Sequence, residues 1–175
     1  MDIKGAAFLF TLAGLMITFA GLSALLLVLR QSAGARVSRL DRYIAKTVMT
    51  YMFSLTAGAL LPPLLALYDM PEDLIWRVAG VGFAVPMAAL QVSYPVRRRM
   101  AVGSAPPFAV YAIFVVLGSA ATLAMLAYIV AGFEYRAAAY ISALTVDFFT
   151  VIYGFVAALD IIMLQPLELP DPPPL

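Results

Sequence analysis

The most constraining feature of this sequence is a series of five apolar runs, each close to the length that a helix needs to cross a lipid bilayer. The runs cover about residues 6–29, 48–68, 74–94, 108–132 and 137–164. A transmembrane helix needs roughly 20 apolar residues. With 64% hydrophobic and 12% charged residues, the chain has too little polar surface to coat a soluble globule. We therefore predict an all-α integral membrane bundle of five transmembrane helices, a single domain over residues 1–175 with a proline-rich tail at 165–175.

The basic residues gather in two of the connections between these runs. Of the eleven lysines and arginines, the two connections hold eight, namely Arg30, Arg36, Arg39, Arg42 and Lys46, then Arg97, Arg98 and Arg99. Loops on the cytoplasmic side of a membrane carry an excess of such residues. We therefore predict that the N-terminus is outside, the C-terminus is inside, and the arginines act as topology anchors or contacts to anionic lipid. The stretch 30–46 is either a short surface helix or a solvated connector.

The composition also suggests where the protein resides. Nine of the eleven basic residues are arginine, and alanine, glycine, valine and leucine are abundant, a bias typical of bacteria with GC-rich genomes. Together with the five runs, this bias predicts a multi-pass protein of the bacterial cytoplasmic (inner) membrane.

Small residues recur at helical spacing in three of the runs. The first run carries Ala7, Thr11, Gly14, Thr18 and Gly21, which we call the small-residue stripe. Gly118 precedes Thr122 by four residues in the fourth run, and Gly154 lies in the fifth. Because small side chains let helix backbones approach closely in membranes, we predict that these residues are helix-packing positions that lie against other helices.

Prolines interrupt two of the runs. Pro62 and Pro63 should bend the second helix and Pro86 the third, whereas Tyr94 and Pro95 should close the third helix. Each proline leaves a backbone carbonyl without its usual donor. These prolines either shape the bundle or create a hinge or polar cavity, so Pro86 is retained as a candidate functional residue.

One acid, Asp147, lies deep inside an apolar run, where an unpaired charge is expensive. At about 100° per residue, the small and polar residues of its helix fall on the same side as Asp147. These residues are Tyr140, Ala143, Thr150, Gly154 and Ala158. The bulky residues Phe148, Phe149, Ile152, Phe155, Val156 and Leu159 fall on the other side and should face lipid. Asp147 and Thr150 are therefore candidate functional residues that face the protein interior.

Two partners are possible for Asp147. Arg77 is a basic residue about one turn into the third run, at a similar depth, and could form a buried ion pair with it. Alternatively, Arg77 pairs with Asp73, four residues earlier on the same helix, and points outward. Asp147 would then be protonated and bonded to a threonine, a tyrosine or a carbonyl freed by Pro86.

The sequence argues against catalysis. It contains no cysteine and no histidine, which excludes disulfides, thiolate chemistry, histidine-ligated haem and Cys/His zinc sites. Asp147 and Asp160 are thirteen residues apart on one helix, about 20 Å, and cannot form an aspartyl-protease dyad. A net charge of +1 indicates no nucleic-acid partner. We expect a protein that is not an enzyme and holds no cofactor or metal.

Two function classes remain. In the first, the chain is a small non-catalytic membrane protein, an accessory or scaffold subunit that packs with copies of itself or with a larger membrane complex. In the second, it is a small ion or proton pathway in which Asp147 binds the moving cation. A single deep acid and an odd number of runs argue against the second class, so the first is favoured.

Overall fold

The structure of this chain, a computed structural model, describes residues 3–32 and 38–163, with side chains described up to residue 159. These residues form α1 (Ala6–Ser32), α2 (Arg39–Ala66), α3 (Glu72–Val102), a long helix divided into α4 (Phe108–Val110), η1 (Tyr111–Leu117) and α5 (Gly118–Ala131), and α6 (Arg136–Met163). Five helices, counting 108–131 as one, are long and apolar enough to cross a membrane, and the described residues include no strand. The prediction of an all-α chain with five such helices is confirmed. The tail 165–175 lies outside the described residues.

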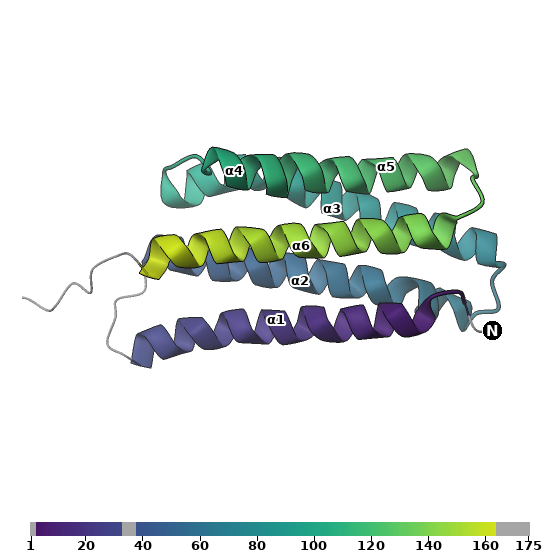
Figure 1. The fold of residues 1–175 in the computed structure, drawn as a ribbon, viewed down its shortest axis with the longest axis horizontal. Coiled ribbons are helices and arrows are strands. Elements are labelled where there is room, and N and C mark those ends of the chain that lie inside the picture. The colour runs from purple at the N-terminus through teal and green to yellow at the C-terminus, as the bar shows by residue number, and fades with distance from the viewer. Residues whose placement is uncertain (1–2, 33–37, 164–175) are drawn as a thin grey trace, which may run out of the picture.

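Four of the helices form a closed ring, and α1 lies outside it (Figure 1). In this ring α2 packs on α3, α3 on α5, α5 on α6, and α6 on α2. α1 packs along α2 and reaches α6 through Phe19, whose ring meets Phe148 and Phe155 edge-on, with centroids 6.4 and 5.2 Å apart. Phe148 and Phe155 are therefore buried under α1, and the prediction that they face lipid is wrong. Phe149 and Val156 are exposed as predicted.

α2 begins well before the apolar run that predicted it. Ser38 caps the helix: its hydroxyl accepts from the backbone N–H of Asp41 at 3.0 Å, and the Asp41 carboxylate accepts from the backbone N–H of Ser38 at 3.0 Å. This reciprocal capping box satisfies two amide groups that the helix itself leaves without partners. Arg39, Arg42 and Lys46 consequently belong to the first turns of α2. The residues from 39 onward form neither a separate surface helix nor a solvated connector.

α3 continues through Pro95 to Val102, so the prediction that Tyr94 and Pro95 close it is wrong. A proline in a helix removes one donor, which neighbouring polar groups can compensate in an apolar environment. The carbonyl that Pro95 leaves without its usual N–H is that of Gln91. Arg97 turns back along the helix to the neighbouring residue, and its Nη2 donates to the Leu90 carbonyl at 2.7 Å. The helix ends at Gly103, whose φ of 77° is a left-handed conformation that favours glycine.

Pro62 has a compensating contact in the bundle interior. Its ring nitrogen cannot donate to the carbonyl of Gly58, one turn earlier. That carbonyl instead accepts from the hydroxyl of Tyr140 on α6 at 2.7 Å. The phenol ring is fully buried against Trp76 and Phe83 of α3. One hydroxyl thus ties α6 to α2 at the position where a proline weakens α2.

Gly58 also shows how closely α2 and α3 approach each other. A Cβ on Gly58 would lie 2.5 Å from the Phe83 ring, so α2 and α3 meet at this point because residue 58 has no side chain.

Pro86 lies exposed on the outside of α3. This position does not support the prediction that Pro86 creates a hinge or a polar cavity inside the bundle.

We expect Tyr140→Phe to destabilise the fold by about 1–3 kcal/mol, because it leaves the buried Gly58 carbonyl without a donor while keeping the ring. Thermal unfolding in mild detergent measures the change. Tyr135→Phe is the matched control, since Tyr135 is 66% exposed and the same oxygen is removed. Equal unfolding midpoints for the two variants would show that the Tyr140 hydroxyl does not support α2.

Candidate functional site

Asp147 lies at the centre of a polar cluster inside the ring. Its Oδ1 accepts from Nε2 of Gln91 on α3 at 2.8 Å, and its Oδ2 accepts from Oγ1 of Thr122 on α5 at 2.8 Å. All three residues are 0% exposed. Because hydrogen bonds between helices are retained where no water competes, this cluster joins α3, α5 and α6. The prediction that Asp147 faces the protein interior is confirmed.

Gly118 provides the space for this cluster. A Cβ at residue 118 would lie 2.7 Å from Nε2 of Gln91 and 3.1 Å from Oδ1 of Asp147, closer than the contacts that side chains make. Gly118 is one turn before Thr122, so the two predicted packing residues both face the carboxylate. The π-helical segment η1 ends at Leu117, next to Gly118, and such segments change which side chains of the following helix face inward.

The chemistry of the cluster is limited to one ionisable group and neutral partners. Neither Gln91 nor Thr122 carries a charge, and within the described residues Oε1 of Gln91 has no hydrogen-bond donor. Thr150, predicted as a functional neighbour, is buried, but its hydroxyl donates to the backbone carbonyl of Asp147 at 2.8 Å rather than to the carboxylate. Thr150 therefore stabilises the local helix geometry.

Arg77 does not meet Asp147. Its Nε lies 3.1 Å from Oδ2 of Asp73, and about half of each side chain is exposed. Asp73 also pairs with Arg136 at the start of α6. The predicted buried pair is wrong and the alternative, the pair four residues apart, is confirmed. An outward Arg77 avoids the cost of burying a guanidinium and reaches an acid on its own helix.

The predicted arginine anchors have different surroundings. Arg39, Arg42 and Arg99 are exposed, and Arg36 lies outside the described residues. Arg30, at the end of α1, lies 3.1 Å from the buried carboxylate of Asp41 on α2. The two groups are close enough to attract as charges, although their orientation is not that of a hydrogen bond.

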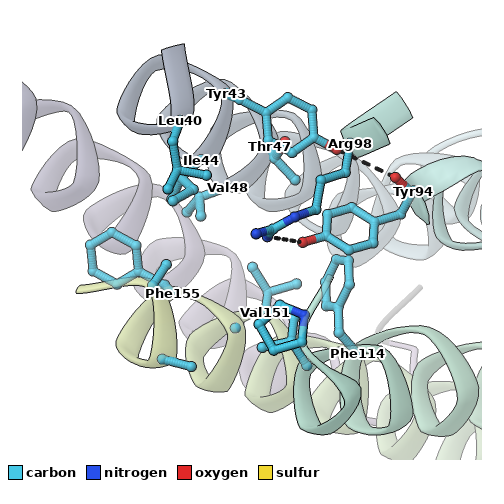
Figure 2. A pocket seen from close by; sticks show the side chains of 15 residues that line it. Leu40, Tyr43, Ile44, Thr47, Val48, Tyr94, Arg98, Phe114, Val151 and Phe155 are labelled. Atoms are coloured by element: carbon cyan, nitrogen blue, oxygen red, sulfur yellow. Dashed lines mark hydrogen bonds between the residues drawn. The ribbon is translucent and has the colours of Figure 1, made fainter. Parts of the chain in front are cut away.

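Arg97 and Arg98 point toward the helices rather than away from them. Besides the Leu90 carbonyl, Nη2 of Arg97 donates to the hydroxyl of Tyr51 at 3.3 Å. Arg98 is only 8% exposed, and its Nη1 donates to the Tyr94 hydroxyl over a long 3.4 Å. The guanidinium of Arg98 extends into a cavity between the helices (Figure 2).

The cavity around Arg98 is narrow and mostly apolar. The cavity has a volume of about 40 Å³ and lies within about 550 Å³ of space that is partly open to the outside. Such a space is a slot rather than a chamber, and we call it the Arg98 slot. Its walls come from five helical segments and one loop residue: Leu40, Tyr43, Ile44, Thr47 and Val48 of α2, Tyr94 and Arg98 of α3, the loop residue Pro107, Val110 of α4, Phe114 of η1, and Val151, Gly154, Phe155, Ala157 and Ala158 of α6.

Within the part of the chain that the structure describes, the small-residue stripe of α1 packs on no other helix. Gly14, Thr18 and Gly21 are exposed, and a Cβ on either glycine would meet nothing within 4 Å. The opposite face of α1 packs on the ring through Leu9, Leu12, Ala13, Met16, Ala20 and Ser23. Gly154, by contrast, lies beside another segment of the bundle: a Cβ at this position would be 3.9 Å from the Phe114 ring, an ordinary van der Waals distance. Packing by the stripe therefore stays a prediction that requires a helix from outside the chain.

Sequence reasoning missed Gln91 as the partner of Asp147. The residue was detectable, because it is the one amide side chain in any of the five predicted runs. A buried amide in an apolar helix needs a partner, and Asp147 is the deepest acid. What the sequence does not specify is that Gly118 and the π-helical segment bring Thr122 to the same place.

Comparisons of the chain with protein-family models, curated proteins and solved structures found no match. The class of protein accordingly comes from the fold. Five apolar helices, three of which are joined by a buried polar cluster, suggest a multi-pass membrane protein built as a helical bundle.

We expect Gly118→Ala to destabilise the protein by about 1–3 kcal/mol, because the added methyl group overlaps the amide of Gln91. Gly14→Ala is the matched control: it makes the same chemical change in open space and gains helix propensity. Unfolding midpoints in detergent compare the two. If Gly118→Ala were as stable as Gly14→Ala, the Gln91 to Asp147 contact would not be as close as described.

Proposed function

We propose that this protein is a non-catalytic membrane subunit, an accessory or scaffold protein that associates through the small-residue stripe of α1 with a transmembrane helix of another copy or of a larger complex. The observation that carries the proposal is the direction of the stripe. At about 100° per residue, Gly14, Thr18 and Gly21 lie on the side of α1 opposite to Leu12 and Met16, which pack on the ring.

The stripe suits a partner helix better than lipid. Glycine at an exposed helix position costs stability relative to alanine, so it is useful where a second backbone must come close. The hydroxyls of Thr11 and Thr18 donate to the carbonyls of Ala7 and Gly14 within α1, at 3.0 and 2.8 Å. The stripe therefore presents a smooth surface on which the hydroxyl groups already have acceptors, which favours close van der Waals packing.

The experiment is to replace Gly14 and Gly21 with leucine and to measure the mass of the protein in mild detergent by light scattering, together with the proteins that co-purify. We expect the double variant to lose the oligomer or partner that the unaltered chain retains. Leu15→Phe, a change on the exposed side of α1 away from the stripe, should retain it. Unaltered association in the double variant, or a monomer without partners before any change, would contradict the proposal.

We further propose that the protein lies in the bacterial cytoplasmic membrane with its N-terminus outside and its C-terminus inside. The support is the separation of charge along the bundle: Arg39, Arg42 and Arg97–Arg99 lie at one end, and Glu72 and Asp73 begin α3 at the other. Reporter fusions after Ser104 and at the C-terminus should read cytoplasmic, whereas a fusion near Glu72 should read external. An external signal at Ser104 would reverse this orientation.

A second candidate function is an ion or proton pathway through Asp147. The observation that favours it is an acid that is completely buried next to an amide oxygen of Gln91 without a donor. Two observations weigh against it: both carboxylate oxygens already accept a hydrogen bond, and the cavities described here do not include Asp147. Proton or cation flux in liposomes that Asp147→Asn abolishes would favour this function over the scaffold.

A further inference from the structure

Arg98 is a buried cation with few partners. A guanidinium has five N–H donors, yet within the described residues Arg98 makes one long contact, to the Tyr94 hydroxyl, and its buried Nε has no acceptor. Among the residues that the structure describes, the side chains that line the slot around it include no carboxylate. Burying a charge without a counter-charge is expensive, so the site favours an anion.

The Arg98 slot is apolar away from the guanidinium. Figure 2 shows Arg98 reaching between Val48 on α2 and Val151 on α6, with Phe114 beside Tyr94. Along α6 the walls run from Val151 to Ala158, which is about 10 Å of helix. Because the slot is narrow and elongated, a single hydrocarbon chain fits its shape better than a bulky ligand does.

A second, basic groove lies next to the slot. Arg39, Arg42, Lys46 and Arg97 line it, and it shares two wall residues, Tyr43 and Thr47, with the Arg98 slot. A cluster of exposed basic residues raises the local concentration of anions at a membrane surface. The groove can therefore attract the same kind of ligand that the buried guanidinium would hold.

We propose that the Arg98 slot binds an anionic phospholipid, with its phosphate on the guanidinium of Arg98 and an acyl chain along the apolar walls formed by α2 and α6. Arginine suits a phosphate because its N–H groups form paired, charge-assisted hydrogen bonds. The inference rests on the proposed membrane location but not on the proposed association through α1, and Arg98 and the stripe are tested by separate variants.

The test measures the unfolding midpoint of the full chain in detergent with added phosphatidylglycerol or, separately, phosphatidylcholine. A ligand that binds the folded state raises the midpoint. We expect phosphatidylglycerol to raise the unfolding midpoint more than phosphatidylcholine does. Arg98→Gln should weaken the apparent affinity for phosphatidylglycerol about tenfold or more, because it removes a charged hydrogen bond. Arg99→Gln, an equal charge change at an exposed neighbour, should keep the difference between the lipids.

Two further measurements distinguish a lipid from a free anion as the ligand of the Arg98 slot. Inorganic phosphate should not reproduce the shift, and Gly154→Leu, which fills the slot beside Phe114, should reduce the shift although Arg98 is intact. The proposal is overturned if both lipids act equally on the unaltered chain, if Arg98→Gln retains the difference, or if inorganic phosphate gives the full shift. Should Arg98→Gln not fold, native mass spectrometry of the unaltered chain decides: a phosphatidylglycerol adduct supports the site, and its absence overturns it.

Discussion

The structure depends on a pair of hydrogen bonds to one carboxylate. Asp147 is held by Gln91 and Thr122, and each of the three residues belongs to a different helix of the ring. In an apolar bundle the packing of leucine and valine against each other sets few unique positions, because many registers bury similar surface. A buried acid with two neutral donors has few alternatives, so it sets the register of α3, α5 and α6 together. This role in specificity requires no transport or catalysis.

The same principle explains the behaviour of the prolines. Each proline leaves a carbonyl that must find another donor, since no water competes inside an apolar bundle. For Pro62 that donor is the hydroxyl of Tyr140, which lies 82 residues after Gly58 in the sequence and reaches the Gly58 carbonyl because α6 packs on α2. A second tyrosine hydroxyl also bonds to the backbone of another helix: Tyr51 on α2 donates to the Leu90 carbonyl on α3, although no proline lies four residues after Leu90.

The sequence predicted the elements well and their partners poorly, for physical reasons. Hydrophobic length located five helices, and the small and polar face of the fifth helix placed Asp147 inward. Phe148 and Phe155 were misjudged because a helix pattern cannot show that α1 covers one side of α6. For Arg77 the sequence left two acids open, Asp147 at a similar depth and Asp73 four residues earlier, and the structure pairs it with Asp73, which leaves the guanidinium partly exposed. The start of α2 could have been predicted from Ser38 and Asp41, because their spacing is that of a capping box.

α1 is joined to the ring by apolar packing rather than by hydrogen bonds between side chains of the described residues. Its hydroxyl groups bond to carbonyls of α1 itself, and the charged contact that the structure gives it with another helix is between Arg30 and Asp41 at its far end. Within the described residues, moving α1 away would leave the hydrogen bonds of Asp147 and Tyr140 intact and would uncover mainly apolar side chains, which lipid or another helix can cover. Within the described residues, the side-chain hydrogen bonds that join helices thus lie inside the ring of four, and α1 is held to it by apolar packing, most extensively against α2, together with the charged contact of Arg30 and Asp41.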